Sequence, residues 1–260
     1  MRRAPIILCL PLLTVGCKLF EDLKDAVDEL TQPILMQAVF IGLEEPDAGA
    51  GFDLTDTELG NGSTVNAYVY DVNLSTGSSP ATGAAVSLVS ESLGSVGLAE
   101  GGGGAYSADG GDGLDYRAGD QVEIVADYGG ARHRIAMRTP DPASLTIPED
   151  HSAGMGINID LRGQGFVNAV VMVLDLSSGG EVVWESEVDP TSPKDSNNLT
   201  QSIPGSVFTD GGLYLVGVVG LESADEADFH EVQALGSGML SGTMVLHPVS
   251  TLSGIDTGAW

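Results

Sequence analysis

The chain has 260 residues, with 37 acidic and 10 basic side chains and a formal net charge of −27. Nucleic-acid recognition depends on Lys and Arg side chains that neutralise phosphates, so this balance excludes nucleic acid as a main partner. Hydrophobic residues make up 42% of the chain, which is enough for a folded core and excludes a disordered acidic tail.

The first seventeen residues contain the three parts of a bacterial export leader. Arg2 and Arg3 form a positive start, and residues 4–13 form an apolar run. A permanent membrane helix needs about 20 apolar residues, so this run is too short to be one. Residues 14–17, Thr-Val-Gly-Cys, resemble the lipobox of bacterial lipoproteins. The resemblance implies a signal peptide at 1–16, a lipid such as palmitate on Cys17, and no lasting role for Cys9. The alternative is a secreted protein in which Cys17 is incidental.

The residue after the cysteine bears on location. In the lipoprotein family an Asp there favours the inner membrane, and this chain has Lys18. The resemblance therefore implies a lipid-anchored envelope protein in the outer membrane. No acid precedes Cys17 and two of the ten bases do, so the mature chain has 8 bases, 37 acids and a net charge of −29.

Residues 18–30 place apolar side chains on one helical face, namely Leu19, Leu23, Val27 and Leu30. This spacing predicts a short amphipathic helix, and residues 17–33 would then be the lipidated cysteine and its tether. A frayed juxtamembrane helix is the alternative, because thirteen residues are marginal for an isolated helix.

From Ile34 onward, short apolar or alternating runs are separated by Gly, Asp, Asn, Pro and Ser, which predicts strands. The predicted strands are Ile34–Leu43, Thr64–Val72, Ala84–Ser90, Gln121–Tyr128, Ala131–Arg138, Ile157–Leu161, Val167–Leu174, Glu181–Glu185, Leu213–Leu221 and Met239–Val249. Many short strands without long helices predict an all-β fold of sandwich type.

A faint internal repeat indicates two domains. Asp109-Gly-Gly recurs as Asp210-Gly-Gly at an offset of 101, and the Val-Asn-Ala at 65–67 recurs at 167–169. We therefore predict two tandem immunoglobulin-like or transthyretin-like sandwiches, at residues 34–143 and 144–250, with a Pro-containing linker at 139–142 and a tail at 251–260. Chance similarity between unrelated strand patterns is the alternative.

Residues 65–128 also resemble the transthyretin-like sandwich of carboxypeptidase regulatory-like domains. The resemblance rests on Pro80, on Gly83-Ala-Ala-Val-Ser-Leu, on Gly104-Ala-Tyr and on Tyr116-Arg-Ala-Gly. The residues inserted between Tyr106 and Tyr116 depart from the family's pattern. The family is generally non-catalytic, so the resemblance implies a display or interaction module rather than an enzyme.

Motifs for catalysis are mostly missing from the sequence. There is no Gly-x-Ser-x-Gly elbow and no Gly-Lys pair for a phosphate loop. His230-Glu-Val-Gln-Ala234 begins like a zinc-protease motif, but Ala234 stands where the second His must be. His133, His151 and His247 have no ligand-like spacing. We therefore predict a non-catalytic structural or interaction role, with an envelope protein or a glycan as the partner.

The best candidate ion site is a Gly-rich acidic stretch formed by Asp109, Asp112, Asp115 and Asp120. Closely spaced carboxylates on a flexible loop can surround Ca²⁺, which takes six to eight oxygen ligands. A solvated hairpin loop without metal is the alternative. A calcium- or carbohydrate-binding surface module is thus the second hypothesis for function, with no other cofactor expected.

Basic residues are rare enough that a group of them is informative. Arg132, Arg134 and Arg138 have the two-residue spacing of one strand face. They either form a docking stripe for an acidic group or neutralise carboxylates nearby.

Overall fold

The computed structural model describes residues 34–44, 62–73, 77–186, 196–224 and 238–252. These ranges consist mainly of strands, and the helical segments among them are 3-10 turns of three or four residues. The all-β prediction is therefore confirmed. The leader, Cys17 and the predicted helix at 18–30 lie outside the described residues, as does His230.

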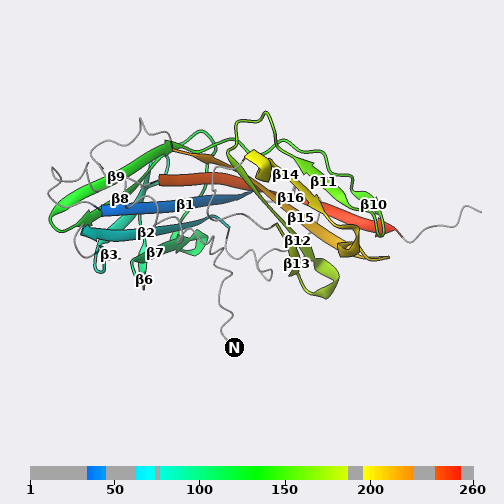
Figure 1. The fold of residues 1–260 in the computed structure, drawn as a ribbon, viewed down its shortest axis with the longest axis horizontal. Coiled ribbons are helices and arrows are strands. Elements are labelled where there is room, and N and C mark those ends of the chain that lie inside the picture. The colour runs from blue at the N-terminus through cyan, green and yellow to red at the C-terminus, as the bar shows by residue number, and fades with distance from the viewer. Residues whose placement is uncertain (1–33, 45–61, 74–76, 187–195, 225–237, 253–260) are drawn as a thin grey trace, which may run out of the picture.

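Sixteen strands are described (Figure 1). Their bounds are β1 Ile34–Glu44, β2 Thr64–Asn73, β3 Gly77–Pro80, β4 Ala85–Ser90, β5 Gly94–Gly97, β6 Ala99–Gly102, β7 Ala105–Asp109, β8 Gln121–Tyr128, β9 Ala131–Arg138, β10 Asp150–Ser152, β11 Ile157–Asp160, β12 Asn168–Asp175, β13 Glu181–Glu185, β14 Thr200–Ile203, β15 Leu213–Ser223 and β16 Gly238–Leu252. The 3-10 turns are η2 Gly110–Asp112, η3 Leu176–Ser178, η4 Ser196–Leu199 and η5 Gly205–Val207.

All ten strands predicted from the sequence are present, and β8, β9 and β13 have the predicted bounds. The strands that the sequence did not indicate are short, with three to five residues each. Three of them, β3, β5 and β6, are rich in Gly or Ser, which have no apolar side chain to reveal a buried face.

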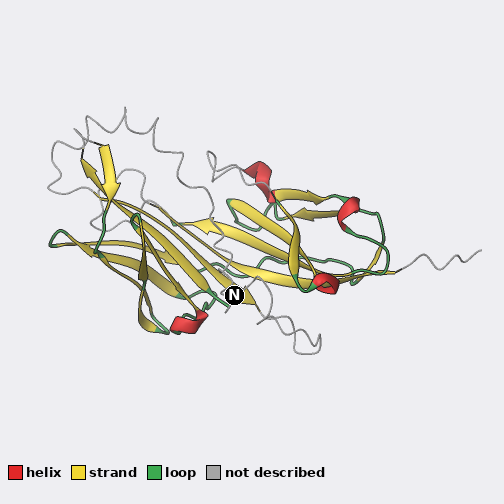
Figure 2. Ribbon diagram, turned by 90° about the horizontal axis from the view of Figure 1, so that it is seen from below, coloured by secondary structure: helices red, strands yellow, loops and turns green. Residues whose placement is uncertain are grey.

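One ten-stranded sheet runs through the whole described chain. Its order is β13-β12-β15-β16-β1-β2-β7-β6, with β10 also paired to β16 and β3 also paired to β2. The long strand β16 connects the two ends, because it pairs antiparallel with β15 and, over residues 238–245, parallel with β1. Figure 1 shows β1 and β16 side by side along the middle of the molecule, and Figure 2 shows the strands in a view turned by 90°.

Two smaller sheets form the second layer of the sandwich. The sheet β5-β4-β8-β9 lies over the part of the large sheet that contains β1 and β2, and the pair β11-β14 lies over the part that contains β12 and β15. Two cores result. One draws its side chains from residues 34–137, joined by Ala224 and Met239, and the other from residues 143–249. We call residues 34–143 the first half and residues 144–252 the second half.

The opposite face of the large sheet carries a third apolar cluster. Its buried members come from four neighbouring strands: Val39, Ile41, Val170, Met172, Leu174, Leu215, Val219, Leu221, Leu240, Met244 and Leu246. Strands β12 and β15 therefore bury side chains on both faces, since their other faces belong to the second core. This explains why the sequence of both strands is apolar without alternation.

Glycines let aromatic rings close onto the sheet where the halves meet. A Cβ at Gly42 would lie 2.3 Å from Cγ of Tyr116, and one at Gly220 would lie 2.6 Å from the ring of Phe166. On the strand between them, a Cβ at Gly242 would lie 2.2 Å from the carbonyl oxygen of Gly220. Close packing beside the ladder of β1 and β16 therefore requires glycine at these positions for steric reasons.

Candidate functional site at the β8–β9 hairpin

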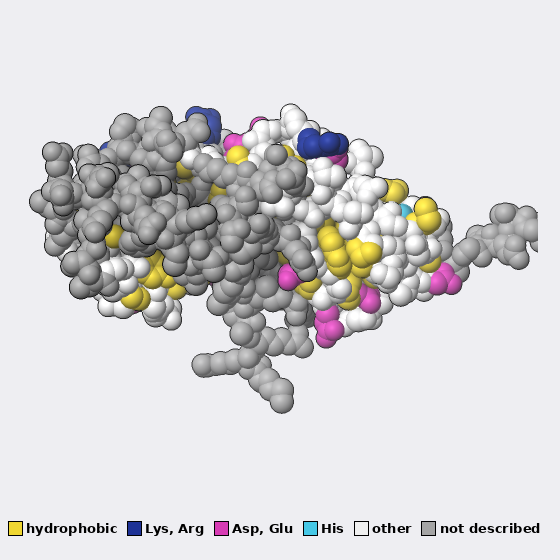
Figure 3. Space-filling view, viewed as in Figure 1, with side chains coloured by type: hydrophobic (Ala, Val, Ile, Leu, Met, Phe, Trp, Pro, Cys, Tyr) yellow, Lys and Arg dark blue, Asp and Glu magenta, His cyan; other side chains and the backbone are white. Residues whose placement is uncertain are grey.

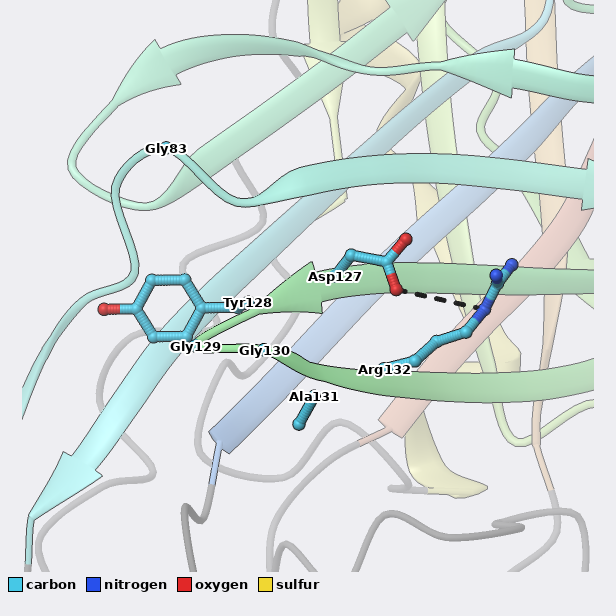
Figure 4. Close-up of a pocket in the computed structure, with 7 residues that line it drawn as sticks. All are labelled: Gly83, Asp127, Tyr128, Gly129, Gly130, Ala131 and Arg132. Atoms are coloured by element: carbon cyan, nitrogen blue, oxygen red, sulfur yellow. Dashed lines mark ion pairs between the residues drawn. The ribbon is translucent and has the colours of Figure 1, made fainter.

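A hollow of about 450 Å³ lies at the tip of the β8–β9 hairpin (Figure 4). The strands are joined by Gly129 and Gly130, whose φ angles of 60° and 82° are the left-handed values that a two-residue hairpin turn needs. Gly83 reaches the same hollow from the turn before β4. The remaining lining residues are Asp127, Tyr128, Ala131 and Arg132.

The side chains of the hollow combine an aromatic ring with an ion pair. Tyr128 is half-buried and packs against the first core, which holds its ring in place. Arg132 Nε lies 4.0 Å from Asp127 Oδ1, and both side chains are more than half exposed. Figure 4 shows the Tyr128 ring on one side of the hairpin tip and the two charged groups on the other. The hollow is therefore lined by an apolar ring at one end and by a hydrogen-bond donor and an acceptor at the other.

Strand β9 carries three arginines, which lead away from the hollow along the strand. Its core-facing residues His133, Ile135 and Met137 are buried, whereas Arg132, Arg134 and Arg138 point to the opposite, solvent-facing side. The ladder with β8 is regular and places Arg132 opposite Asp127, Arg134 opposite Val125 and Arg138 opposite Gln121. We call these three arginines the arginine stripe.

Most arginines of the described chain have acidic partners. Arg117 pairs with Asp115 at 3.2 Å and Arg162 with Asp160, while Arg132 has Asp127. Within the described ranges, neither Arg134 nor Arg138 lies within 4 Å of a carboxylate. The prediction left open whether the stripe neutralises carboxylates or serves for docking. Among the described residues, a carboxylate lies within contact distance of Arg132 and of neither of the other two.

The predicted calcium ligands make separate local contacts. Asp109 caps the 3-10 turn η2 by accepting a hydrogen bond from the Gly111 N–H at 2.7 Å, and Asp112 accepts one from the Asp109 N–H at 3.2 Å. Asp115 is paired with Arg117. These are the contacts of a capped turn, in which the carboxylates satisfy backbone donors.

Asp120 lies elsewhere, at the start of β8, where it accepts hydrogen bonds from the hydroxyls of Ser90 and Ser92. Burial opposes ionisation of this carboxyl, but the two serine hydroxyls and the backbone N–H groups of Ser92 and Gln121 together outweigh it and hold the pKa of Asp120 below its ordinary value. Across the described part of the chain, no group of three or more His, Cys, Asp or Glu is placed to hold a metal ion. The calcium site remains a prediction.

One histidine has an environment that the sequence did not reveal. His133 is 7% exposed, and its Nε2 has no hydrogen-bond partner in the described structure. Burial lowers the pKa of His133, and the nearby charge of Asp127 opposes this only in part. His151 differs, because its ring contacts Phe208 edge-on and its Nε2 lies 2.8 Å from the Met155 carbonyl oxygen.

On the face shown in Figure 3, the Lys and Arg side chains of the described residues are visible only near the upper edge. Acidic and hydrophobic side chains are seen across the second half. No described helix is long and apolar enough to cross a bilayer.

No family model matches the chain, and no curated protein matches it. Among solved structures, the chain is similar to the Yersinia pseudotuberculosis adhesin InvE, with 16% identity and a TM-score of 0.21. The match covers 84% of this chain and 58% of the adhesin chain. At that TM-score the likeness supports no argument about function.

Proposed function

We propose that this protein is anchored to the outer membrane of a bacterial envelope by a lipid on Cys17, and that it has a non-catalytic structural or interaction role. The observation that carries the proposal is the coincidence of a leader with a cysteine at its end, in residues 1–17. Two or three acyl chains on one cysteine would hold the protein on its membrane, because each buried CH₂ contributes about 0.8 kcal/mol.

We also propose that the two halves are tandem immunoglobulin-like or transthyretin-like sandwiches. The support is that each half has its own core and a buried tyrosine whose hydroxyl ties a turn. Tyr106 donates to the Ala81 carbonyl oxygen and accepts from the Ala84 N–H, and Tyr214 accepts from the Thr209 N–H. A tyrosine near the start of a strand that bonds to backbone a few residues upstream, as Tyr214 does, is typical of immunoglobulin-like sandwiches.

The anchor is tested by Cys17→Ser, with Cys9→Ser as the matched control. The first change removes the sulfur that carries the lipid, so the protein should move from the detergent phase to the aqueous phase. The second removes a cysteine of the leader, and the protein should stay in the detergent phase. If the unmutated protein is found in the aqueous phase, and its N-terminal peptide mass still includes residues before Cys17, the proposal fails.

The second candidate is a ligand-binding surface module, and the hollow at the hairpin favours a glycan over calcium. An aromatic ring beside a donor and an acceptor suits a sugar. Calcium is tested separately by thermal melting. Screening alone predicts equal stabilisation by NaCl and CaCl₂ at matched ionic strength. A real site predicts a saturable, calcium-selective increase that Asp112→Asn with Asp115→Asn abolishes.

A further inference from the structure

We propose that the hollow and the arginine stripe together bind an acidic polysaccharide, with one sugar unit in the hollow and its neighbouring carboxylates on Arg134 and Arg138. The inference deepens the proposed interaction role by naming a ligand class. It does not depend on the lipid anchor, because the binding can be measured with the protein in neutral detergent or in water.

The first argument is that two arginines of the stripe have no acidic neighbour within 4 Å among the described residues. The chain has 37 acidic side chains and only 10 basic ones, so a base that lacks an acidic neighbour is unexpected. Arg117, Arg132 and Arg162 all have such a neighbour close in sequence. Arg134 and Arg138 have none within 4 Å in the described chain, although Glu123 lies on the same face, opposite Ala136. Among the described residues, no carboxylate occupies either guanidinium group, and a guanidinium can bind an external carboxylate with two parallel hydrogen bonds.

The second argument is continuity. Arg132 both lines the hollow and begins the stripe. From Arg132 to Arg138 the strand rises by about 20 Å, at about 3.3 Å per residue. A ligand that fills the hollow thus meets a line of charge in which Arg132 and Arg138 are exposed and Arg134 is half-buried, and such a line suits an extended polymer better than a single small molecule.

The third argument is the rigidity of the hollow. Tyr128 is held by the first core, and the Gly129-Gly130 turn is set by its left-handed backbone. A ring fixed before binding loses little conformational entropy when a sugar stacks on it. The ion pair of Asp127 and Arg132 supplies an acceptor and donors for sugar hydroxyls.

The charge of the rest of the protein should restrict the place where a polyanion binds. The net charge of −27 repels a polyanion from the protein as a whole, and this repulsion is screened beyond about 10 Å at ordinary salt. At the stripe itself, three arginines face two acids of β8, Glu123 and Asp127. Binding should therefore be confined to the stripe and weaken as salt is added.

The experiment measures fluorescence anisotropy of labelled oligogalacturonate with the complete mature chain. Its fully methyl-esterified form serves as the matched ligand, because it keeps the sugar backbone and lacks the charges. We expect saturable binding of the acid form and at least tenfold weaker binding of the ester. Arg134→Gln with Arg138→Gln should weaken binding of the acid form about tenfold or more. Tyr128→Ala should weaken binding of both forms.

The matched protein control is Arg162→Gln, which removes one charge from an arginine paired with Asp160 in the second half. It should change the affinity less than twofold, and circular dichroism should show that every variant is folded. The proposal is wrong if the acid form does not bind at millimolar concentration, if the ester binds equally well, or if Arg162→Gln weakens binding as much as the stripe variant. None of these outcomes affects the detergent test of the lipid anchor.

Discussion

The two halves of the molecule cover one continuous sheet to different extents. In the first half the second layer is a four-stranded sheet, whereas in the second half it is the pair β11-β14. The second half has an additional buried surface, because β12 and β15 also contribute to the third apolar cluster on the far face of the large sheet. In the second half a small second layer is thus accompanied by burial on both faces of the large sheet, and burial of apolar side chains is the main source of stability.

Despite this difference, both halves use the same hydrogen-bonded tie at the end of a strand. Thr139 Oγ1 accepts from the Asp120 N–H at 2.9 Å and donates to the Arg117 carbonyl oxygen. Thr251 Oγ1 accepts from the Gly212 N–H at 2.7 Å and donates to the Thr209 carbonyl oxygen. In each case the threonine bridges two positions three residues apart, in the turn that precedes the neighbouring strand.

The largest effect is expected at the junction that joins the halves. Gly242→Ala places a Cβ 2.2 Å from the Gly220 carbonyl oxygen, and backbone on neighbouring strands cannot move away locally. We expect a loss of about 3 kcal/mol or more in the free energy of unfolding. Denaturant unfolding measures this loss. Gly97→Ala on β5 is the control, because its Cβ meets open space, and it should change stability by about 0.5 kcal/mol or less.

The threonine ties should be of equal importance if the halves are built alike. Thr139→Val and Thr251→Val keep the shape of the side chain and remove its hydroxyl. Each leaves a donor and an acceptor of a turn without that partner, so each should cost about 1–3 kcal/mol. Comparison of the two unfolding curves checks this expectation. A loss at one threonine and none at the other would show that only one half depends on its tie.

The smallest expected effect is a pH dependence of stability that arises from His133, in the first half. Because burial keeps the pKa of His133 below its ordinary 6.5, the folded protein holds this ring neutral while the unfolded chain binds a proton as the pH falls through 6.5. Stability from this group is therefore complete above about pH 7 and decreases below it, by up to about 1.4 kcal/mol per pH unit. The unfolding midpoint of native protein should fall more between pH 7.5 and 5.5 than that of His133→Gln. Equal decreases would show that His133 is not the source.

Strand positions could be predicted from the sequence because a strand is a local pattern. Alternation along Gln121–Tyr128 and Ala131–Arg138 gave the bounds of β8 and β9, and the same alternation put the three arginines on one face. Pairing between distant strands is not local. Nothing in residues 34–44 indicates that β1 pairs with a strand about 200 positions later.

The internal repeat is a second case in which sequence spacing does not indicate contacts between distant residues. Sequence spacing matched Asp109-Gly-Gly with Asp210-Gly-Gly, whereas the similar threonine hydrogen bonds lie at residues 117–120 and 209–212. The hollow was also beyond sequence reasoning, because Gly83 reaches the hairpin through the pairing of β4 with β8. The same is true of Arg134 and Arg138, since their lack of acidic neighbours depends on which residues β8 places opposite them.

The central claim, that β1 and β16 join the halves into one sheet, is tested most directly by a disulfide across their parallel ladder. Leu43 and Met244 are partners in register, so Leu43→Cys with Met244→Cys should form a disulfide under mild oxidation, in a chain that carries Cys17→Ser. The bond would close a loop of about 200 residues and should raise stability by up to about 5 kcal/mol. Peptide mass analysis without reduction should show the cross-linked pair in high yield, and Leu43→Cys with Leu246→Cys, two residues out of register, should give little. Failure of the first pair, or a higher yield from the second, would contradict the shared sheet.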